Sequence, residues 1–439
     1  MTAAEAVARL FGLARFEQAG MRPGLERIEA VLAALGHPEG DLPVVHVGGT
    51  NGKGSVSALT EAILRAAGLR TGLYTSPHLL DVTERIRIAG VPIARDDFGR
   101  LAARLAPWLQ AGSLTFFEAV TALAFLAFRE AGVEAAILEV GMGGRWDATN
   151  VGPAGVAVIT RVDYDHQQFL GWHLADIAAE KAAIVRGGVA LSAAQAPEAL
   201  DVVEARCRAV GVPLFVEGRD IRAEVVGSDL RGHLIRFAWT GPGGAGALAD
   251  VELALPGLYQ PPNAALAVGA ARTFATTTGR NVPDAAVRAG CAGIRWPGRF
   301  QVVPGGPGRP LIVLDGAHNP GGAHALAASL RHYFPGAALA LILGISADKD
   351  RAGILKALAP VATRLYFTAA SNPRAAAPAD LAGELPPFEG RVTTAPDVAT
   401  ALRAALAERG NDVVCVAGSL FLIADALRWL GEAGLVDRA

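Results

Sequence analysis

Lysine, cysteine and net charge are all scarce in this sequence of 439 residues. Its three cysteines (Cys207, Cys291 and Cys415) lie far apart, without metal-site spacing, which is typical of buried thiols in a reducing cytosol. The net charge of −2 provides no general basic field, so we expect no non-specific nucleic-acid binding. The longest apolar runs are about ten residues, half of what a bilayer requires, and the first twenty residues mix charges among apolar residues, unlike a secretory signal. We therefore expect a cytoplasmic protein with no membrane contact.

The shortage of lysine is the most informative of these features. Only four of the 40 basic residues are lysines, namely Lys53, Lys181, Lys349 and Lys356. Arginine stays protonated and supplies most surface charge, whereas the lysine amine can be neutralised and chemically modified. A lysine inside a motif is therefore a candidate for chemistry, although four ordinary lysines retained by chance are the alternative.

The remaining composition predicts a folded α/β protein. Hydrophobic residues make up 51% and charged residues 19%, which excludes a disordered chain, and about 150 residues per domain predicts two or three domains. Apolar strands alternate with helical stretches, a pattern that favours a parallel sheet. The predicted strands are residues 43–49, 70–75, 135–140 and 156–160, and the predicted helices are residues 55–67 and 115–129.

The pattern changes twice further along the chain. Residues 212–255 contain short alternating runs between glycine-rich turns, which predict a small antiparallel β subdomain. A helix over 263–278 precedes a second α/β series from residue 300, with strands at 311–314, 339–343, 364–368 and 413–417. Residues 295–299, followed by 304–310, are rich in Pro and Gly and predict a hinge. We expect an N-terminal P-loop-type ATPase domain over 1–295 and a C-terminal Rossmann-like α/β domain over 296–439.

A glycine-rich loop follows the first predicted strand. Residues 48–55 read GGTNGKGS and lead into a helix, which is the context of a phosphate-binding loop. Backbone N–H groups can approach phosphate oxygens there, and Lys53 adds a full positive charge. Gly54 stands where the Walker A pattern has Ser or Thr, so the match to that pattern is incomplete. A tight Asn-Gly turn between strand and helix is the alternative.

Polar residues follow three further predicted strands. Ser76 lies after the second strand, Glu139 ends an otherwise apolar strand, and His166 follows residues 156–160. Ligands of open parallel sheets gather beyond the carboxyl ends of strands, so these residues are expected to converge near the phosphate loop. Ser76 and Glu139 offer the oxygens that Mg²⁺ prefers, whereas His166 is a less usual ligand. Each taken singly could equally be a helix cap or a satisfied structural histidine.

Two further segments of the first half are candidates for ligand contact. The loop over 141–150 (GMGGRWDATN) allows close backbone approach to a ligand, and Asp147 could accept N–H donors from it. A simple glycine-rich connector is the alternative. Lys181 lies on a predicted helix and would ordinarily be solvated, but the low lysine count argues against that interpretation.

The second half contributes Asp315 and His318, which stand three residues apart after a strand and could face a nucleotide or a second substrate. A helix-capping turn is the alternative. Arg299, in the predicted hinge, could reach nucleotide phosphates or could simply be a solvated linker residue. Ser419 ends the last predicted strand. Lys349 stands between Asp348 and Asp350 and could serve only to balance their charge.

Taken together, these motifs resemble the folylpolyglutamate synthase/dihydrofolate synthase family of the Mur-ligase superfamily. The resemblance runs from about residue 20 to residue 425. The motifs that carry it are 24–27 (GLER), 49–55 (GTNGKGS), 75–79 (TSPHL) with Glu84 and Arg85, 116–118 (FFE), 139–150, Asp165 and His166 with Leu170 and Gly171, Glu180 and Lys181, Gln260 with Asn263, 297–300 (PGRF), 315–320 (DGAHNP), and Gly418 with Ser419.

The resemblance implies roles for individual residues. The implied catalytic residues are Lys53, Lys181 and His318. The implied ATP contacts are Asn51, Gly52, Lys53, Gly54, Ser55, Asn263, Arg299 and Asp315. The implied magnesium ligands are Ser76, Glu139, His166 and Lys181, the last as a carbamate that helps to hold a second Mg²⁺. The implied folate or pteroate contacts are Met21, Arg22, Pro23, Thr115, Phe116, Phe117, Glu118, Trp146, Asp147 and Ala148. The implied glutamate contacts are Asp315, His318 and Ser419.

The reaction implied is the ATP-dependent addition of L-glutamate to folates, and also to dihydropteroate, through an acyl phosphate. We expect ATP as a substrate, two Mg²⁺ ions, no organic cofactor and a monomeric enzyme. Trp146 replaces an expected smaller aliphatic residue, and residues 21–23 match the family pattern poorly. One alternative is a Mur-type ligase for a UDP-linked cell-wall precursor, although only 47 residues precede Gly48. The other is a non-enzymatic nucleotide-dependent module.

Overall fold

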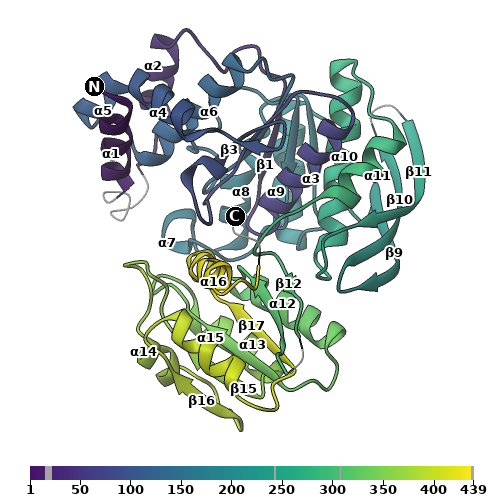
Figure 1. The fold of residues 1–439 in the computed structure, drawn as a ribbon. Helices are drawn as coiled ribbons and strands as arrows, with labels where there is room; N and C mark the ends of the chain where they lie inside the picture. Colours follow the sequence, from purple (N-terminus) through teal and green to yellow (C-terminus); the bar gives the residue numbers. More distant parts are fainter. Residues whose placement is uncertain (15–21, 242–243, 307, 437–439) are drawn as a thin grey trace.

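The computed structural model describes residues 1–14, 22–241, 244–306 and 308–436, which form two lobes (Figure 1). The first lobe contains an eight-stranded sheet with a three-stranded sheet beside it, and the second lobe contains a six-stranded sheet. The chain passes from the first lobe to the second through residues 294–300, between the last helix of one lobe and the first strand of the other. The predicted α/β class is confirmed.

The large sheet has the strand order β4-β3-β2-β5-β1-β6-β7-β8, and only β3 runs against the others, because it pairs antiparallel with both β2 and β4. Its strands are β1 (Val44–Gly48), β2 (Thr71–Tyr74), β3 (Ile86–Ile88), β4 (Val91–Pro92), β5 (Ala135–Glu139), β6 (Val156–Ile159), β7 (Val189–Ser192) and β8 (Leu214–Val216). Val47 of β1 lies opposite Glu139 on one side and Val158 on the other. The loop after β1 therefore emerges between the ends of β5 and β6.

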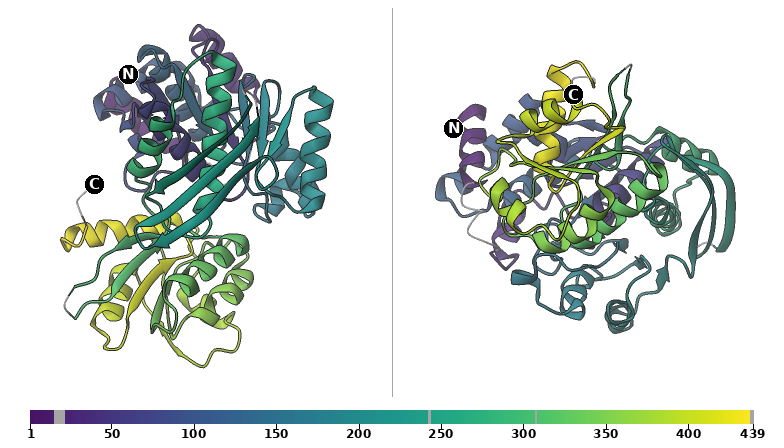
Figure 2. Two further views of the ribbon diagram at one scale, coloured as in Figure 1. Left: turned by 90° about the vertical axis from the view of Figure 1, so that its right-hand side faces the viewer. Right: turned by 90° about the horizontal axis from the view of Figure 1, so that it is seen from below.

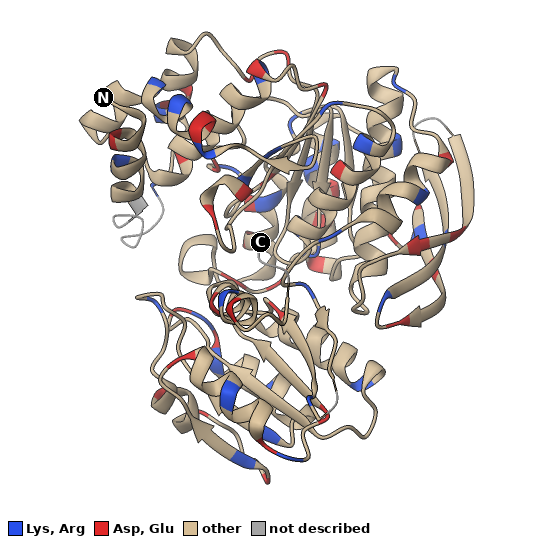
Figure 3. Ribbon diagram, viewed as in Figure 1, with Lys and Arg blue, Asp and Glu red and all other residues tan. Residues whose placement is uncertain are grey.

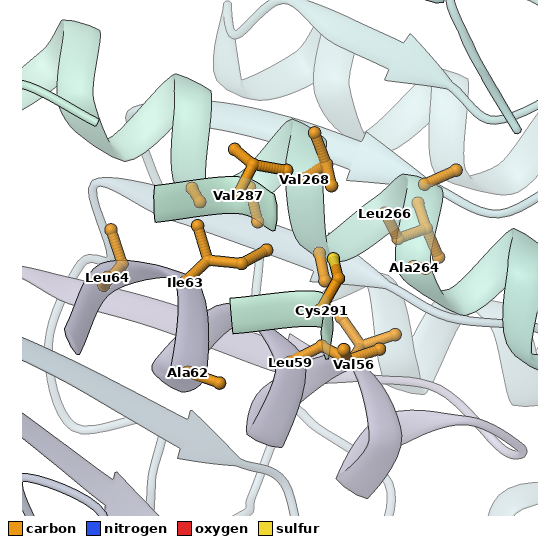
Figure 4. Close-up of a cluster of buried hydrophobic side chains, with 14 of the residues drawn as sticks. Val56, Leu59, Ala62, Ile63, Leu64, Ala264, Leu266, Val268, Val287 and Cys291 are labelled. Carbon is orange, nitrogen blue, oxygen red and sulfur yellow. The ribbon is translucent and has the colours of Figure 1, made fainter. Parts of the chain in front are cut away.

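Helices cover both faces of this sheet. They are α1 (Ala3–Ala14), α2 (Glu26–Ala34), α3 (Lys53–Ala66), α4 (Arg95–Arg104), α5 (Ala106–Ala111), α6 (Phe116–Glu130), α7 (Gln167–Leu170), α8 (Leu174–Ala182), α9 (Pro197–Val210), α10 (Gln260–Thr278) and α11 (Asp284–Gly293), with a 3₁₀ turn at Val82–Arg85. Figure 4 shows α3 packed against α10 and α11 through Leu59, Val268 and Val287. A Cβ on Gly290 would lie 2.7 Å from the Ile63 Cα, so α11 and α3 approach closely. This packing fixes the helix that follows the glycine-rich loop.

The antiparallel sheet predicted for residues 212–255 is present over residues 221–253, whereas residues 214–216 form β8, which pairs parallel with β7 at the edge of the large sheet. The strands of the antiparallel sheet are β9 (Ile221–Asp229), β10 (Gly232–Gly241) and β11 (Gly244–Leu253), in the order β11-β10-β9. Ile235 and Phe237 of β10 join the same buried cluster as α3 and α10. The subdomain therefore supports α10 from the side opposite the large sheet (Figure 2).

The second lobe has the strand order β12-β13-β17-β14-β15-β16, parallel except for β12. Its strands are β12 (Gln301–Val303), β13 (Leu311–Asp315), β14 (Leu339–Leu343), β15 (Arg364–Phe367), β16 (Arg391–Thr394) and β17 (Val413–Ala417). Its helices are α12 (Pro320–Tyr333), α13 (Arg351–Leu358), α14 (Pro378–Gly383), α15 (Val398–Ala407) and α16 (Leu420–Glu432), with a 3₁₀ turn at Ala359–Val361. Separate apolar clusters fill the two faces of the sheet, one with α12 and α13 and the other with α15 and α16.

The strands predicted from apolar runs are confirmed in both lobes, but six strands were missed, namely β3, β4, β7, β8, β12 and β16. Most of these are short strands at or near the sheet edges, where partial exposure breaks the apolar run that identifies a strand. No helix in the described part of the chain is long and apolar enough to cross a membrane. Figure 3 shows acidic and basic residues interspersed over both lobes, as the small net charge suggests.

Candidate active site

The glycine-rich loop after β1 requires glycine at two positions. A Cβ on Gly49 would lie 2.0 Å from Thr160 Oγ1, and one on Gly52 would lie 2.5 Å from Asn263 Oδ1. Gly52 also has φ +96° and precedes the first residue of α3. The N–H groups of Thr50 and Asn51 donate to the Arg161 carbonyl, at 2.9 and 3.1 Å. No side chain caps α3, so its first-turn N–H groups remain suited to phosphate oxygens.

Lys53 begins α3 and is partly buried beside the loop. Its Nζ donates to the Thr50 carbonyl at 3.1 Å. Burial lowers the pKa of Lys53, and the negative charge of Glu139 opposes that shift. Behind the loop, Gln260 Nε2 donates to Ser55 Oγ at 3.3 Å, and Gln260 Oε1 accepts from Asn263 Nδ2 at 3.2 Å. The start of α10 is therefore tied to the start of α3.

Glu139 and Ser76 lie together, as their strand-end positions predict. The Ser76 N–H donates to Glu139 Oε2 at 3.0 Å, and Glu139 is only 5% exposed. A Cβ on Gly54 would lie 3.5 Å from the other carboxylate oxygen, so Glu139 faces the glycine-rich loop. Burial raises the pKa of Glu139, and the nearby charge of Lys53 works against that rise.

Lys181 is buried on α8 rather than solvated. Its Nζ donates to the Gly49 carbonyl at 3.0 Å, so the buried side chain reaches the glycine-rich loop. Burial, followed by the charge of Lys53, lowers the pKa of Lys181 to about 7. A substantial fraction of its amine is therefore neutral near pH 7, which is the form that reacts with electrophiles.

Asp165 and His166 lie between β6 and α7 and face the second lobe. Lys349, in the loop between β14 and α13, donates to Asp165 Oδ1 at 2.5 Å, and its Nζ lies 3.3 Å from His166 Nε2. Burial and the Lys349 charge lower the pKa of His166 to about 4. For Asp165, burial alone would raise the pKa, but a hydrogen bond from His318 and the charge of Lys349 hold it well below its usual range.

Two asparagines join the lobes at the glycine-rich loop. Asn51 Nδ2 donates to Asn319 Oδ1 at 3.2 Å, and Asn319 Nδ2 donates back to Asn51 Oδ1 at 3.0 Å. Asn319 also caps α12 by accepting from the Gly322 N–H at 2.8 Å. The adjacent Gly321 touches the first lobe, because a Cβ there would lie 1.8 Å from Asp163 Oδ2. The glycine-rich loop is thus part of the interface between the lobes.

Replacing Gly321 with alanine should push α12 away from Asp163 and Asn51. A shift of this kind, on the order of 1 Å, can cost about 10²-fold in rate when reacting groups come from two lobes, so we expect at least a tenfold fall in kcat/KM for ATP by steady-state kinetics. Gly383→Ala is the matched control, since a Cβ at Gly383 meets nothing within 4 Å. Unchanged kinetics in Gly321→Ala, with the control also unchanged, would mean that this contact does not set the distance between the lobes.

Asp315 ends β13 and is 3% exposed. Its Oδ2 accepts from Tyr259 Oη at 2.5 Å and from the Phe300 N–H at 2.9 Å, and its Oδ1 accepts from the Ala317 N–H at 2.8 Å. Burial raises the pKa of this carboxyl, and these hydrogen bonds oppose the rise. Asp315 thus holds the hinge segment that carries Arg299. The Arg299 side chain lies close to the Gly316 backbone, because a Cβ on Gly316 would be 2.4 Å from Arg299 Nη1.

Asp147 organises its own loop rather than pointing into open space. Its Oδ2 accepts from the N–H groups of Gly141 and Met142, at 2.9 and 3.0 Å, and its Oδ1 accepts from the N–H and hydroxyl of Thr149. Thr149 Oγ1 in turn lies 2.8 Å from Nε2 of the buried His46. Burial raises the pKa of Asp147 against these hydrogen bonds. These four donors make the Asp147 carboxylate a brace for the loop.

Several residues expected to contact folate or glutamate also have local partners. Thr115 and Glu118 form a capping box at the start of α6, and Glu118 Oε1 also accepts from Arg27 Nε at 2.9 Å. Ser419 is 5% exposed and caps α16 by accepting from the Phe421 N–H. In the same set, Phe116, Asp147 and Ala148 are buried, Phe117 is partly buried, Arg22, Pro23 and Trp146 are exposed, and Met21 lies outside the described residues.

The structure brings together Lys53, Glu139, Lys181, His166 and His318 around one loop. It also adds three residues for which the sequence analysis assigned no role at the site, and these are Tyr259, Asn319 and Lys349. The scarcity of lysine was the one available signal for Lys349. The partner of Lys349 is not the neighbouring Asp350, which caps α13 through the Gly353 N–H.

The donor set fits magnesium better than a metal with a complete protein cage. The described residues contain no group of three His, Cys, Asp or Glu side chains arranged to hold a metal. Mg²⁺ needs no such cage, because it keeps water ligands and binds through one or two carboxylates together with substrate phosphates. Glu139, facing a phosphate-type loop beside Ser76, provides that kind of partial site.

Comparison with known proteins matches each lobe to a domain of the same family. Residues 47–271 match the Mur ligase middle domain, and residues 298–420 match the Mur ligase glutamate ligase domain. A dihydrofolate synthase/folylpolyglutamate synthase of Bacillus subtilis is 33% identical over 92% of this chain and 94% of its own length. The corresponding protein of Mycobacterium tuberculosis is 37% identical over 82% of this chain and 77% of its own.

Solved structures agree with the sequence relatives. Mycobacterium tuberculosis folylpolyglutamate synthase complexed with ADP superposes with a TM-score of 0.86 at 34% identity, covering 97% of this chain and 99% of that one. Escherichia coli FolC in complex with DHPP and ADP superposes with a TM-score of 0.87 at 33% identity, covering 99% of this chain and all of that one.

Proposed function

The chain belongs to the folylpolyglutamate synthase/dihydrofolate synthase family of Mur ligases, and we propose that it is an ATP-dependent ligase that joins L-glutamate to folates and to dihydropteroate. The observation that supports this best is the meeting of a phosphate-type loop, a buried carboxylate and a buried lysine at the interface of two Mur-ligase domains. The relatives that match most of the chain carry names of folate ligases. A Mur ligase for a UDP-linked precursor and a non-enzymatic module are therefore not favoured.

The chemistry needs an activated carboxylate, because an amine cannot expel oxide from a free one. We propose that the carboxylate of the folate or pteroate attacks the γ-phosphorus of ATP, releasing ADP and forming an acyl phosphate. The glutamate amine then attacks the acyl carbon, loses a proton and displaces inorganic phosphate, which leaves an amide. The protein contributes positioning and charge neutralisation at the phosphates.

Residues of both lobes are assigned to the nucleotide. Lys53 and the first turn of α3 face the phosphates, and Arg299 approaches from the hinge segment braced by Asp315. The proposed ATP contacts are Asn51, Gly52, Lys53, Gly54, Ser55, Asn263, Arg299 and Asp315. The ties from Gln260 to Ser55 and from Asn51 to Asn319 support this set, because they hold its members around one loop.

The residues that would hold two Mg²⁺ ions are Ser76, Glu139, His166 and a carbamylated Lys181. When bound, these ions neutralise charge on phosphate oxygens. The lowered pKa of Lys181 supports the carbamate, since a neutral amine adds carbon dioxide and releases a proton, and the product is a carboxylate-like ligand. Lys181 then faces the loop as an anion in place of an amine.

The two organic substrates are assigned to the remaining segments. For folate, the proposed contacts are residues 21–23, 115–118 and 146–148, supported by the exposed Trp146 and by Phe117, whose ring presses on Gly141. The proposed glutamate contacts are His318, Asp315 and Ser419. His318 Nε2 lies 3.6 Å from Asp165 Oδ2, at the interface of the lobes.

We also propose that the two functional domains divide at residues 295 and 296, within the segment that joins the lobes. A cytoplasmic monomer is proposed as well. Three buried, unpaired cysteines support the reducing compartment.

The proposed function is tested by mass spectrometry of reaction products. The enzyme is given ATP, Mg²⁺ and glutamate with either dihydropteroate or tetrahydrofolate. We expect each folate substrate to gain glutamate with stoichiometric ADP, and no turnover when the folate or glutamate is omitted. ATP turnover without either substrate, or only with a UDP-muramoyl substrate, would overturn the proposal.

A further inference from the structure

Lys349 reaches across the interface into the predicted metal site. It extends from the loop between β14 and α13 in the second lobe, and its side chain is only 11% exposed. Its Nζ lies 2.5 Å from Asp165 Oδ1 and 3.3 Å from His166 Nε2, both in the first lobe. The lysine is therefore held by two neighbouring residues of one short loop, one an anion and the other an imidazole.

The contact with His166 has a specific chemical consequence. An ammonium group has only N–H donors, so His166 Nε2 must accept through its single ring lone pair. A metal ion coordinated by the same nitrogen uses the same lone pair. Lys349 and a metal ion thus cannot both occupy His166 Nε2, and the ammonium also repels a cation that approaches the imidazole.

We infer that the Lys349 ammonium occupies the position of a metal ion at His166. A divalent metal must displace this ammonium before His166 can act as a ligand. The inference rests on the proposed function for its assignment of His166 to the metal. Lys349 is a positioning residue in this role, because it acts through His166 rather than on a substrate.

The surroundings of Lys349 allow such an exchange without separating the lobes. Asp165 can keep Lys349 after His166 is released, since the ion pair uses a different oxygen from the one that accepts Asn319 Nδ2 at 3.3 Å. The Asn51–Asn319 pair and the Gly321–Asp163 contact hold the same interface independently. The displacement therefore requires only a side-chain movement of Lys349 away from the imidazole.

The other charged groups near His166 do not replace Lys349 in this role. Asp165 favours any cation at this point, whereas His318 and the unmodified amine of Lys181 disfavour one. All three residues belong to the site whichever cation is bound. Lys349 alone contacts the Nε2 atom at hydrogen-bond distance among the described residues. Removing its charge should therefore make metal binding at His166 tighter, whereas an ordinary structural lysine would leave it unchanged or weaken it.

The test measures Mn²⁺ binding to the full-length, nucleotide-free protein by the electron paramagnetic resonance signal of free Mn²⁺. We expect Lys349→Met to bind Mn²⁺ about tenfold more tightly than the wild type, the scale of a like charge removed at close range. Lys349→Arg, which keeps the charge, should bind no more tightly than wild type. Lys356→Met, an exposed lysine on α13, is the matched control and should match the wild type.

A double-variant cycle shows whether the effect passes through His166. In a His166→Ala background, Lys349→Met should no longer tighten Mn²⁺ binding. Wild-type affinity in Lys349→Met, weaker binding, or equal tightening in the His166→Ala background would each overturn the inference. Lys349→Gln provides the same comparison if thermal melting shows that the Met variant is unfolded. Wild-type protein that binds no Mn²⁺ even with an ATP analogue would instead contradict the proposed function.

Discussion

Replacing Lys53 with methionine should lower kcat/KM by about 10²–10³-fold, the usual effect of removing one fixed donor to a transition-state anion. Methionine keeps much of the length of the side chain but removes the only full positive charge within the 48–55 loop. Arg299 belongs to the hinge segment, where its Nη1 donates to the Gly298 carbonyl at 3.2 Å, and it does not replace the charge at the start of α3. The measurement is ADP release with saturating folate and glutamate, at several ATP concentrations.

Lys356→Met is again the matched control for Lys53→Met, since it removes an exposed lysine far along the chain in α13. We expect its kinetics to stay within twofold of the wild type. A Lys53→Met enzyme that is folded by thermal melting and still turns over ATP at near wild-type rates would show that the loop does not hold the triphosphate.

Replacing Lys181 with arginine should abolish most activity, with an expected fall in kcat of about 10²–10³-fold. Lys181 is buried, donates to the Gly49 carbonyl at 3.0 Å and has its pKa lowered to about 7. The lowered pKa means that the neutral amine gains population as the pH rises through about 7, and only that form adds carbon dioxide. Arginine stays protonated and cannot form the carbamate. Steady-state kinetics at pH 8, with and without added bicarbonate, measure the effect.

The same experiment has an internal comparison. Wild-type enzyme depleted of carbon dioxide should regain activity when bicarbonate is added, whereas Lys181→Arg should not respond. Glu180→Gln is the neighbouring control, because that side chain pairs with Arg145 at the surface, at 2.8 Å. An active Lys181→Arg enzyme, or a wild type indifferent to bicarbonate, would contradict the carbamate.

Much of the candidate site was predictable from single segments of sequence. The order apolar strand, glycine-rich loop and helix identified residues 48–55, and the strand-end positions of Glu139 and Ser76 predicted the contact that the structure contains. Predictions of this kind succeed because the carboxyl ends of parallel strands must share one edge. The edge strands β4 and β16 escaped prediction because their exposed residues interrupt the apolar pattern.

Contacts between the lobes could not be predicted in the same way. Lys349 stands between two acids in the sequence, yet its ion pair is with Asp165, 184 residues away. Asp147 and Asp315 were predicted to contact ligands, and the structure adds that each also accepts hydrogen bonds from donors of its own chain. A polar residue in a loop has many available partners, and only the packing of separate elements decides which one it reaches.

By itself, the sequence determined the α/β class and the position of the glycine-rich loop, and it singled out Lys53 and Lys181 as candidates, because each of these depends on a short continuous pattern or on the rarity of one residue type. Only the tertiary structure decided that Asn51 meets Asn319, that Tyr259 braces Asp315, and that Lys349 contacts His166. These pairs depend on how one lobe sits against the other, which follows from the burial of surfaces spread over the whole chain rather than from any local pattern.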